Sequence, residues 1–244
     1  MIVRPQEAAM CNTYSMLSNP DAIRNFVDAL TGEMLNMPAF YGIFPDYTAP
    51  IVRNFRGKRE MAYARWGLPS LKWVDSGNPE KGSTNVRHPW FDDWNGYLGV
   101  QNRCLVPVTS FAEPTKLDDG KSGNAWFSLD EGDPLFFFAG LWTPWHGMRR
   151  KDEGTRNHDT FAFLTTKPND VVGVIHEKAM PVILTTAAEC EVWLTAAWPD
   201  AKKLQRPLTD GSLFVKSKQP LGYDSNGRPF DKGDPLRPAE PKLL

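Results

Sequence analysis

Short, continuously apolar segments separated by proline and glycine limit the fold of this chain more than any other feature of its sequence. Between about Pro38 and Val108 the apolar residues come in short segments broken by proline and glycine, which predicts strands joined by long connections. Later segments are too short and too continuously apolar for surface helices, and they predict buried strands at 105–108, 135–142, 160–165 and 181–184.

Two helices are predicted near the ends of this strand-rich region. Asn19 and Pro20 supply an N-cap and a first-position proline for a helix that is expected to stop at Gly32. A Thr-x-x-Glu capping box at 186–189 opens a second helix that runs toward Ala197. The sequence therefore predicts an α+β fold, a single domain built on a curved or barrel-like, mostly antiparallel β-sheet with flanking helices.

Chain length and local composition set the expected domain boundaries. With 244 residues the chain can bury one full core, so we expect one domain, at 10–216. Residues 1–9 show no clear periodicity and are interpreted as a leader or a misassigned start. From 217 to 244 five prolines and few apolar positions predict a mobile tail.

Overall composition excludes several classes of protein. The chain is 41% hydrophobic and 23% charged, which is ordinary for a folded soluble protein and excludes disorder throughout. No apolar run approaches the ~20 residues of a membrane span, and no secretory signal is present, so we expect a cytoplasmic protein with no membrane partner. Three cysteines without a CxxC pair argue against a disulfide framework and a sulfur-based zinc site. No metal and no organic cofactor is expected.

The charge of the chain is small overall but locally uneven. The formal net charge is −1, whereas residues 51–74 carry six basic residues against one acid, interleaved with Tyr63, Trp66 and Trp73. Such a mixture suits single-stranded nucleic acid, in which cations follow phosphates and each stacked ring contributes ~1–3 kcal/mol. The alternative is a solvated charged face over core tryptophans, and composition alone leaves both interpretations open.

The cysteines divide into two structural candidates and one unexplained case. Cys104 and Cys190 lie in apolar or helical sequence and are interpreted as buried, inert thiols. Cys11 directly follows a second methionine, Met10, near the start of the chain. Either Cys11 is also a buried inert thiol, or it is the first residue of the working protein.

Two further ionisable side chains stand out from the remainder. His176 and Glu113 lie among apolar segments, so each is either a core residue with a hydrogen-bond partner or an acid/base group. The other histidines lie in polar, loop-like sequence without metal-ligand spacing and are interpreted as surface residues: His88, His146 and His158.

Several short motifs occur together and in a fixed order. They are Met10-Cys11-Asn12, Ala-Arg-Trp-Gly-Leu-Pro at 64–69, Thr-Asn-Val-Arg at 84–87, Arg-Cys-Leu-Val-Pro at 103–107 with Phe-Ala-Glu at 111–113, Ala-Gly-Leu-Trp at 139–142, and Ile-His at 175–176 with Met-Pro-Val-Ile-Leu at 180–184. In this combination the chain resembles the SOS-response-associated peptidase family, whose members crosslink to abasic sites in single-stranded DNA. The resemblance spans nearly all of residues 10–195.

The resemblance implies that Cys11 is the catalytic nucleophile once it becomes the N-terminal residue. An N-terminal cysteine offers an α-amine with a pKa of ~7.7–8.0 and a thiol with a pKa of ~8.5 on adjacent carbons. The amine can form a Schiff base with the aldehyde of an open abasic deoxyribose, and the thiol can then close a thiazolidine ring. With residues 1–9 attached, the nitrogen is an amide and cannot react.

The resemblance also assigns roles to residues around this nucleophile. His176 is placed to protonate the sugar oxygen, and Glu113 to hold and deprotonate the α-amine. Asn85 is expected to orient the adduct, and Arg87 to contact a phosphate. After Arg87 the acidic residue common in the family is replaced by His-Pro-Trp at 88–90.

The expected partner is single-stranded DNA containing abasic sites, bound by a monomer. Arg65, Trp66 and Lys72 are assigned to the DNA-binding surface, with Trp66 either stacking on a base or supporting the pocket. Two other functions stay open. One is cysteine peptidase chemistry, including self-cleavage before Cys11; the other is non-covalent binding of single strands, in which Cys11 is incidental.

Overall fold

The structure of the chain is a computed structural model that describes residues 11–29 and 37–230. The strands are β1 (Thr13–Met16), β2 (Phe40–Ile43), β3 (Thr48–Phe55), β4 (Lys58–Trp66), β5 (Asn85–Val86), β6 (Arg103–Val108), β7 (Ser110–Lys116), β8 (Ser122–Ser128), β9 (Phe136–Met148), β10 (Thr155–Thr166), β11 (Met180–Pro181), β12 (Ile183–Leu184) and β13 (Phe214–Pro220). The helices are α1 (Pro20–Val27), α2 (Asp170–Gly173), α3 (Ala187–Thr195) and α4 (Trp198–Ala201), with short 3-10 turns at Asn95–Tyr97, Val100–Asn102 and Lys202–Leu204.

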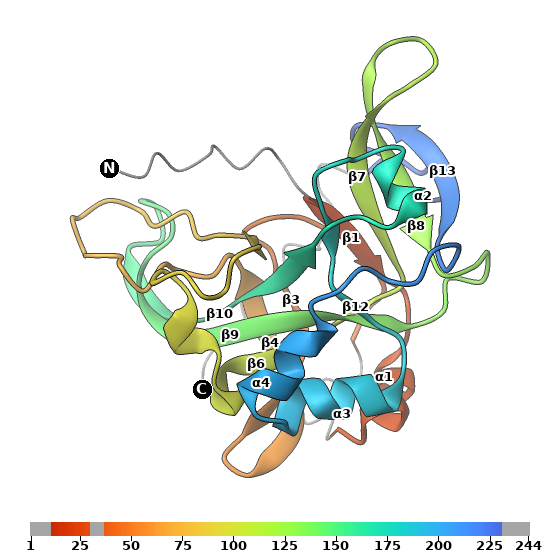
Figure 1. Ribbon diagram of the computed structural model, residues 1–244. Helices are drawn as coiled ribbons and strands as arrows, with labels where there is room; N and C mark the ends of the chain where they lie inside the picture. The colour runs from red at the N-terminus through yellow and green to blue at the C-terminus, as the bar shows by residue number, and fades with distance from the viewer. Residues whose placement is uncertain (1–10, 30–36, 231–244) are drawn as a thin grey trace.

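Five strands close into a small barrel (Figure 1). The order around the barrel is β10-β4-β3-β6-β9, and β9 pairs with β10 to complete the ring. Every pairing in the ring is antiparallel except β4 with β10, which is parallel. Closure leaves these central strands with few open edges. The predicted fold class, a barrel-like and mostly antiparallel sheet with flanking helices, is confirmed.

A second sheet packs beside the barrel in the order β13-β8-β7-β1-β2. The chain passes from the barrel into this sheet at Thr109, between β6 and β7. Strand β1 pairs antiparallel with β7, and the register sets Thr13 opposite Ala112. This register brings the start of β1 next to the middle of β7, which is the contact that builds the candidate site.

Aromatic side chains fill the core between the two sheets. Trp66, Tyr14, Phe138 and Phe163 are all fully buried. The ring of Tyr14 meets Trp66 edge-on at a centroid distance of 5.2 Å, and the rings of Phe138 and Phe163 lie 4.6 Å apart. Edge-to-face and tilted contacts at these distances are the favoured aromatic arrangements. The high aromatic content of the sequence is therefore used largely in the core.

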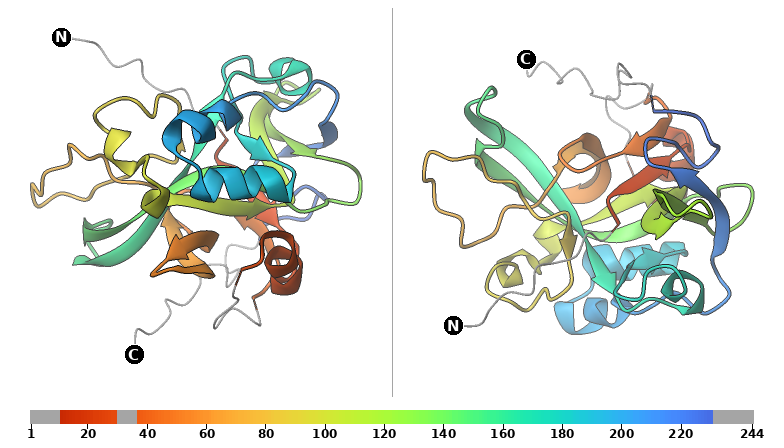
Figure 2. Two further views of the ribbon diagram at one scale, coloured as in Figure 1. Left: turned by 60° about the horizontal axis from the view of Figure 1, so that its bottom comes forward. Right: turned by 90° about the horizontal axis from the view of Figure 1, so that it is seen from above.

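The helices begin as their caps predict. The Asn19 side chain accepts a hydrogen bond from the Ala22 backbone N–H at 2.9 Å, and α1 ends at Asp28 in a left-handed conformation. Gly32, the expected stop, lies outside the described residues. The Thr186 side chain caps α3, and α3 and α4 lie across one side of the barrel (Figure 2, left). Within the described ranges, no helix is long and apolar enough to cross a membrane.

The expected mobile tail is wrong for residues 217–230. Residues 214–220 form β13, which pairs with β8 along its length, and Asp224 and Ser225 just beyond it are buried. The sequence does not predict this strand, because most of its side chains are polar and all are exposed or only partly buried, so it lacks the apolar alternation that marks a strand. Residues 231–244 and the expected leader at 1–9 lie outside the described residues.

The basic stretch 51–74 carries less free charge than its sequence suggests. It forms most of the β3–β4 hairpin, and three of its arginines make ion pairs with carboxylates. The partners are Glu60 and Asp159 for Arg53, Glu191 for Arg59, and Asp46 and Glu153 for Arg65. Most of these acids come from other parts of the chain, so the local charge count overstates what this face offers to a polyanion.

Arg103 ties α3 to the barrel, and its loss is expected to be costly. Its fully buried guanidinium donates to the carbonyl oxygens of Leu98, Trp193 and Ala196 at 3.2, 2.8 and 2.6 Å. Arg103→Leu leaves these acceptors without a donor, which should lower the free energy of unfolding by about 3 kcal/mol or more. Urea unfolding measures the change, and Lys58→Leu on the exposed hairpin end should shift stability by less than about 0.5 kcal/mol. Equal effects of the two substitutions would contradict this assignment.

Candidate active site

Cys11 lies fully buried two residues before β1, next to Ala112 and Glu113 of β7. Its thiol donates to the Thr13 carbonyl oxygen at 3.6 Å. Burial raises the pKa of the Cys11 thiol well above its ordinary value, and the nearby Glu113 carboxylate raises it further; backbone hydrogen bonds from Thr13 and Ala112 partly oppose both effects. The thiol is therefore held protonated until a neighbouring base accepts its proton.

Glu113 projects from β7 to the backbone of Cys11. The Cys11 peptide N–H donates to the Glu113 carboxylate. The side chain is only 1% exposed, and Oε2 has no hydrogen-bond partner among the described residues. Burial raises the pKa of the Glu113 carboxyl well above its usual range, and the hydrogen bond from Cys11 only partly opposes this effect. Glu113 is thus a buried carboxyl group directed at the nitrogen of Cys11.

Asn85 approaches Cys11 from the barrel side. Strand β5 runs parallel to β10, with Asn85 opposite Phe163, and this pairing fixes the position of the amide. Its Nδ2 donates to the Thr84 hydroxyl at 2.9 Å and to the Cys11 carbonyl oxygen at 3.4 Å. Its Oδ1 is buried and unpaired within the described residues, so the side chain keeps one acceptor available.

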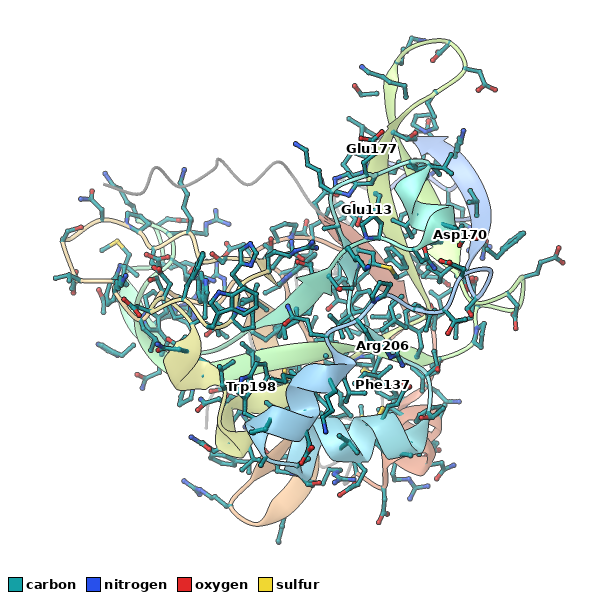
Figure 3. The ribbon with its side chains drawn as sticks, in the orientation of Figure 1. Glu113, Phe137, Asp170, Glu177, Trp198 and Arg206 are labelled. Carbon is teal, nitrogen blue, oxygen red and sulfur yellow. The ribbon has the colours of Figure 1, made fainter. Side chains whose placement is uncertain are left out.

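His176 completes the cluster from the loop after α2. Its Nδ1 lies 3.0 Å from the Ala179 carbonyl oxygen and 3.6 Å from Glu113 Oε2. A carbonyl oxygen can only accept, so this contact assigns a proton to Nδ1. Figure 3 shows Glu113 beneath the loop that carries Glu177, the residue next to His176.

Arg87 follows β5 directly and is anchored through its backbone. Gln205 Nε2 donates to the Arg87 carbonyl oxygen at 2.9 Å and to that of Thr165 at 3.0 Å. In the described part of the chain, Nη1 of Arg87 is buried without a hydrogen-bond partner, and burial lowers the pKa of the guanidinium. The sequence does not predict this role of Gln205, because no local pattern indicates a contact between residues 118 positions apart.

Two buried polar atoms beside Cys11 lack a hydrogen-bond partner within the described residues: Glu113 Oε2 and Asn85 Oδ1. Unpaired buried groups are uncommon and costly in folded proteins, and two next to one thiol indicate a site built for a ligand. Two acceptors beside a thiol suit a hydroxyl-bearing carbonyl compound.

The expected DNA-binding residues of the basic stretch do not join this cluster. Trp66 is fully buried, and its indole N–H donates to the Thr84 carbonyl oxygen at 2.9 Å. No ring face of Trp66 is exposed, so its contact next to Asn85 supports the site from behind. The Arg65 guanidinium lies between two carboxylates, with Nε 2.7 Å from Asp46 Oδ1. Lys72 is exposed, on a loop outside the cluster.

Other features of the surface do not add to the cluster. A pocket of about 670 Å³ lies between β4 and the β9–β10 ribbon, and none of the cluster residues lines it. Its lining includes Tyr63, Arg65, Trp145 and His158. In the described ranges, no group of three or more histidine, cysteine, aspartate or glutamate side chains is arranged to hold a metal ion.

Comparison with known proteins gives matches over most of the chain. A family model described as SOS response associated peptidase (SRAP) matches residues 10–217. The abasic site processing protein YoqW of Bacillus subtilis is 30% identical over 200 residues, covering 80% of this chain and 85% of the relative. The abasic site processing protein YoaM of the same organism is 28% identical over 189 residues, covering 76% and 79%.

Solved structures share the fold. A protein from Bacteroides thetaiotaomicron superposes with a TM-score of 0.67 at 22% identity, over 84% of this chain and 90% of that one. A protein from Bordetella bronchiseptica gives a TM-score of 0.65 at 24% identity, over 84% and 97%. The barrel with its second sheet is thus an architecture that distant sequences also adopt.

Proposed function

The chain belongs to the SOS response associated peptidase (SRAP) family, and from this membership we propose that it processes abasic sites in single-stranded DNA by forming a covalent bond through Cys11. The relatives YoqW and YoaM are both named for abasic site processing. One observation supports the covalent step most directly. The Glu113 carboxylate accepts a hydrogen bond from the backbone nitrogen of Cys11, the atom that becomes the nucleophilic amine when the Met10–Cys11 peptide bond is absent.

The first step is attack of the α-amine on the aldehyde of the ring-opened abasic sugar. A free amine with a pKa of ~7.7–8.0 is partly neutral at cellular pH, and Glu113 is positioned to take the proton that the nitrogen loses on attack. Addition gives a carbinolamine. Loss of one water, with a proton delivered to the leaving oxygen by His176, gives the Schiff base.

The second step is ring closure by the thiol. Cys11 Sγ adds to the imine carbon, the thiol proton is transferred to the imine nitrogen, and a five-membered thiazolidine forms with no further loss of atoms. The raised pKa of the buried thiol means that this proton transfer needs a base, which Glu113 and His176 provide at 3.6 Å from each other. Asn85 holds the Cys11 carbonyl and keeps Oδ1 available for a sugar hydroxyl.

Intact mass of the protein mixed with an oligonucleotide containing one abasic site tests this proposal. A chain beginning at Cys11 should gain the mass of the oligonucleotide less one water, and the adduct should survive denaturation. A duplex of the same sequence should react more slowly. Salt-sensitive binding without any mass gain would support the non-covalent alternative, and a cut peptide substrate would support the peptidase alternative.

Arg87 is expected to contribute to the affinity for DNA and not to the covalent reaction. Nη1 of its partly buried guanidinium has no hydrogen-bond partner among the described residues, which suits a phosphate next to the abasic nucleotide. Arg87→Ala should raise the half-saturating DNA concentration by about tenfold and reduce the salt slope by about one, with the adduct yield at saturation retained. Arg24→Ala, on the exposed face of α1, is the matched control and should change neither value. A lower yield at saturation would contradict this role.

A further inference from the structure

The turn directly after Arg87 displays three aromatic rings on the surface. His88, Trp90 and Phe91 are all exposed, whereas Pro89 between them is buried. Trp90 and Phe91 are 58% and 52% exposed, more than any other Phe, Tyr or Trp in ranges 11–29 and 37–230. The segment is drawn in gold to yellow on the left of Figure 1. Large aromatic side chains that are exposed together indicate a surface that contacts a ligand or partner.

The three rings, named here the aromatic turn, form one cluster. The centroid of the His88 ring lies 5.0 Å from that of Trp90 and 5.1 Å from that of Phe91. The Trp90 and Phe91 rings are 6.2 Å apart and nearly perpendicular, at 79°. The rings support one another sideways, and the exposed fractions of Trp90 and Phe91 leave ring surface open to solvent.

The backbone beneath the rings is ordered before any ligand arrives. The Phe91 N–H donates to the His88 carbonyl oxygen at 3.0 Å, and the N–H groups of Trp94 and Asn95 both donate to the Phe91 carbonyl oxygen. A preformed surface lowers the entropy lost on binding. The aromatic turn is therefore displayed by a fixed scaffold.

Charge at the foot of the turn is slightly negative. The carboxylates of Asp92 and Asp93 lie 3.4 and 3.8 Å from the Lys72 ammonium group. The Asp93 carboxylate also accepts from the Ser70 hydroxyl at 2.6 Å. Two carboxylates against one ammonium group leave no excess positive charge here, so the aromatic rings suit an uncharged planar group, such as a nucleobase, better than a phosphate.

We propose that the aromatic turn stacks on a nucleobase of the DNA strand beside the abasic nucleotide, with Trp90 as the main contact. This inference rests on the proposed function. Its support is continuity: Arg87, the expected phosphate contact, precedes the turn without a gap, and Asn85 of the cysteine cluster comes two residues earlier. A strand held at Arg87 thus places its next base within reach of the turn, and stacking on an aromatic side chain needs no particular base.

The test separates stacking from the covalent chemistry. Equilibrium binding of a fluorescent single-stranded oligonucleotide is measured in the Cys11→Ala background, so that no adduct distorts it. Trp90→Ala should raise the half-saturating DNA concentration by about tenfold, and Trp90→Phe should restore most of the affinity. Phe214→Ala, on an exposed aromatic residue of β13, is the matched control and should leave binding unchanged.

A second comparison identifies the base. Two oligonucleotides are compared, with a base-free spacer in place of the nucleotide on one side or on the other side of the abasic site. Protein that retains Trp90 should bind one of the two about tenfold more weakly than the unmodified oligonucleotide, and should bind the other normally. The Trp90→Ala protein should not distinguish these oligonucleotides. Such non-additivity shows that the missing base and the missing ring belong to one contact.

The outcomes distinguish failure of the inference from failure of the proposed function. If the wild-type protein forms adducts, and Trp90→Ala changes neither DNA binding nor its dependence on the spacer, the stacking role is rejected and the proposed function is retained. Spacer-dependent binding lost in Trp90→Ala supports stacking even if wild-type protein forms no adduct, a result that would reject the proposed chemistry instead. A wild-type dimer in sedimentation that Trp90→Ala dissociates, with DNA binding unchanged, would assign the aromatic turn to a protein interface and overturn the proposal.

Discussion

Cys11→Ser in a chain that begins at residue 11 is expected to abolish the denaturation-resistant adduct while keeping an imine that borohydride can trap. Serine retains the α-amine next to Glu113, so Schiff-base formation continues. The serine hydroxyl is a far weaker nucleophile than the thiol, and without sulfur no thiazolidine ring can form. Denaturing gels with and without borohydride measure the two products, and the loss without borohydride should exceed about 100-fold.

The controls for Cys11→Ser isolate the thiol and the amine. Cys190→Ser removes another buried thiol, located in α3 outside the cluster, and should leave the adduct yield unchanged. Protein that retains the Met10–Cys11 bond should form neither product, because its nitrogen is an amide. A stable adduct from Cys11→Ser without borohydride would show that another residue carries the bond, and would reject the thiazolidine mechanism.

Glu113→Gln is expected to slow adduct formation by about 10²- to 10⁴-fold, the usual contribution of a positioned acid/base group. The amide keeps the shape of the side chain and still accepts the hydrogen bond from Cys11 nitrogen, but it cannot take a proton. Stopped reactions followed by intact mass give the initial rate at saturating DNA. A rate within about threefold of wild type would show that Glu113 is not the proton acceptor.

The same substitution is expected to stabilise the fold at neutral pH. Burial raises the pKa of Glu113 in the folded state, so the stability it contributes is fully present below the unfolded pKa of ~4.3 and is lost as pH rises through the folded value. Glutamine has no such loss. The difference in unfolding free energy between variant and wild type should therefore grow with pH, by up to about 1.4 kcal/mol for each unit by which the folded pKa is raised.

Urea unfolding at pH 4 and pH 8 measures this difference. If Glu113→Gln forms the adduct more slowly and is more stable at pH 8, the Glu113 carboxylate serves the reaction and lowers the stability of the fold. Asp133→Asn, which removes a carboxylate paired with Lys216 outside the site, is the control and should destabilise the protein or leave it unchanged at pH 8. Equal or lower stability of Glu113→Gln at pH 8 would contradict the raised pKa.

Local sequence chemistry determined the elements of this protein because it acts between near neighbours. The asparagine and threonine caps of α1 and α3 bond to backbone N–H groups within the first turn, so both helix starts were predictable. Apolar runs such as 135–142 predicted strands because a buried strand must be apolar along its length. Motif order, through the family resemblance, also selected the residues now found around Cys11.

Only the tertiary structure decided how these pieces combine. Pairing of β1 with β7 sets Cys11 against Glu113, and Asn85 reaches Cys11 across 74 positions of sequence. Long-range pairing likewise neutralised three arginines of the β3–β4 hairpin, enclosed Trp66, and made the mostly polar residues 214–220 a strand. Such outcomes depend on partners far along the chain, whose distance in space is set by barrel closure and strand register, and neither is encoded in any local pattern.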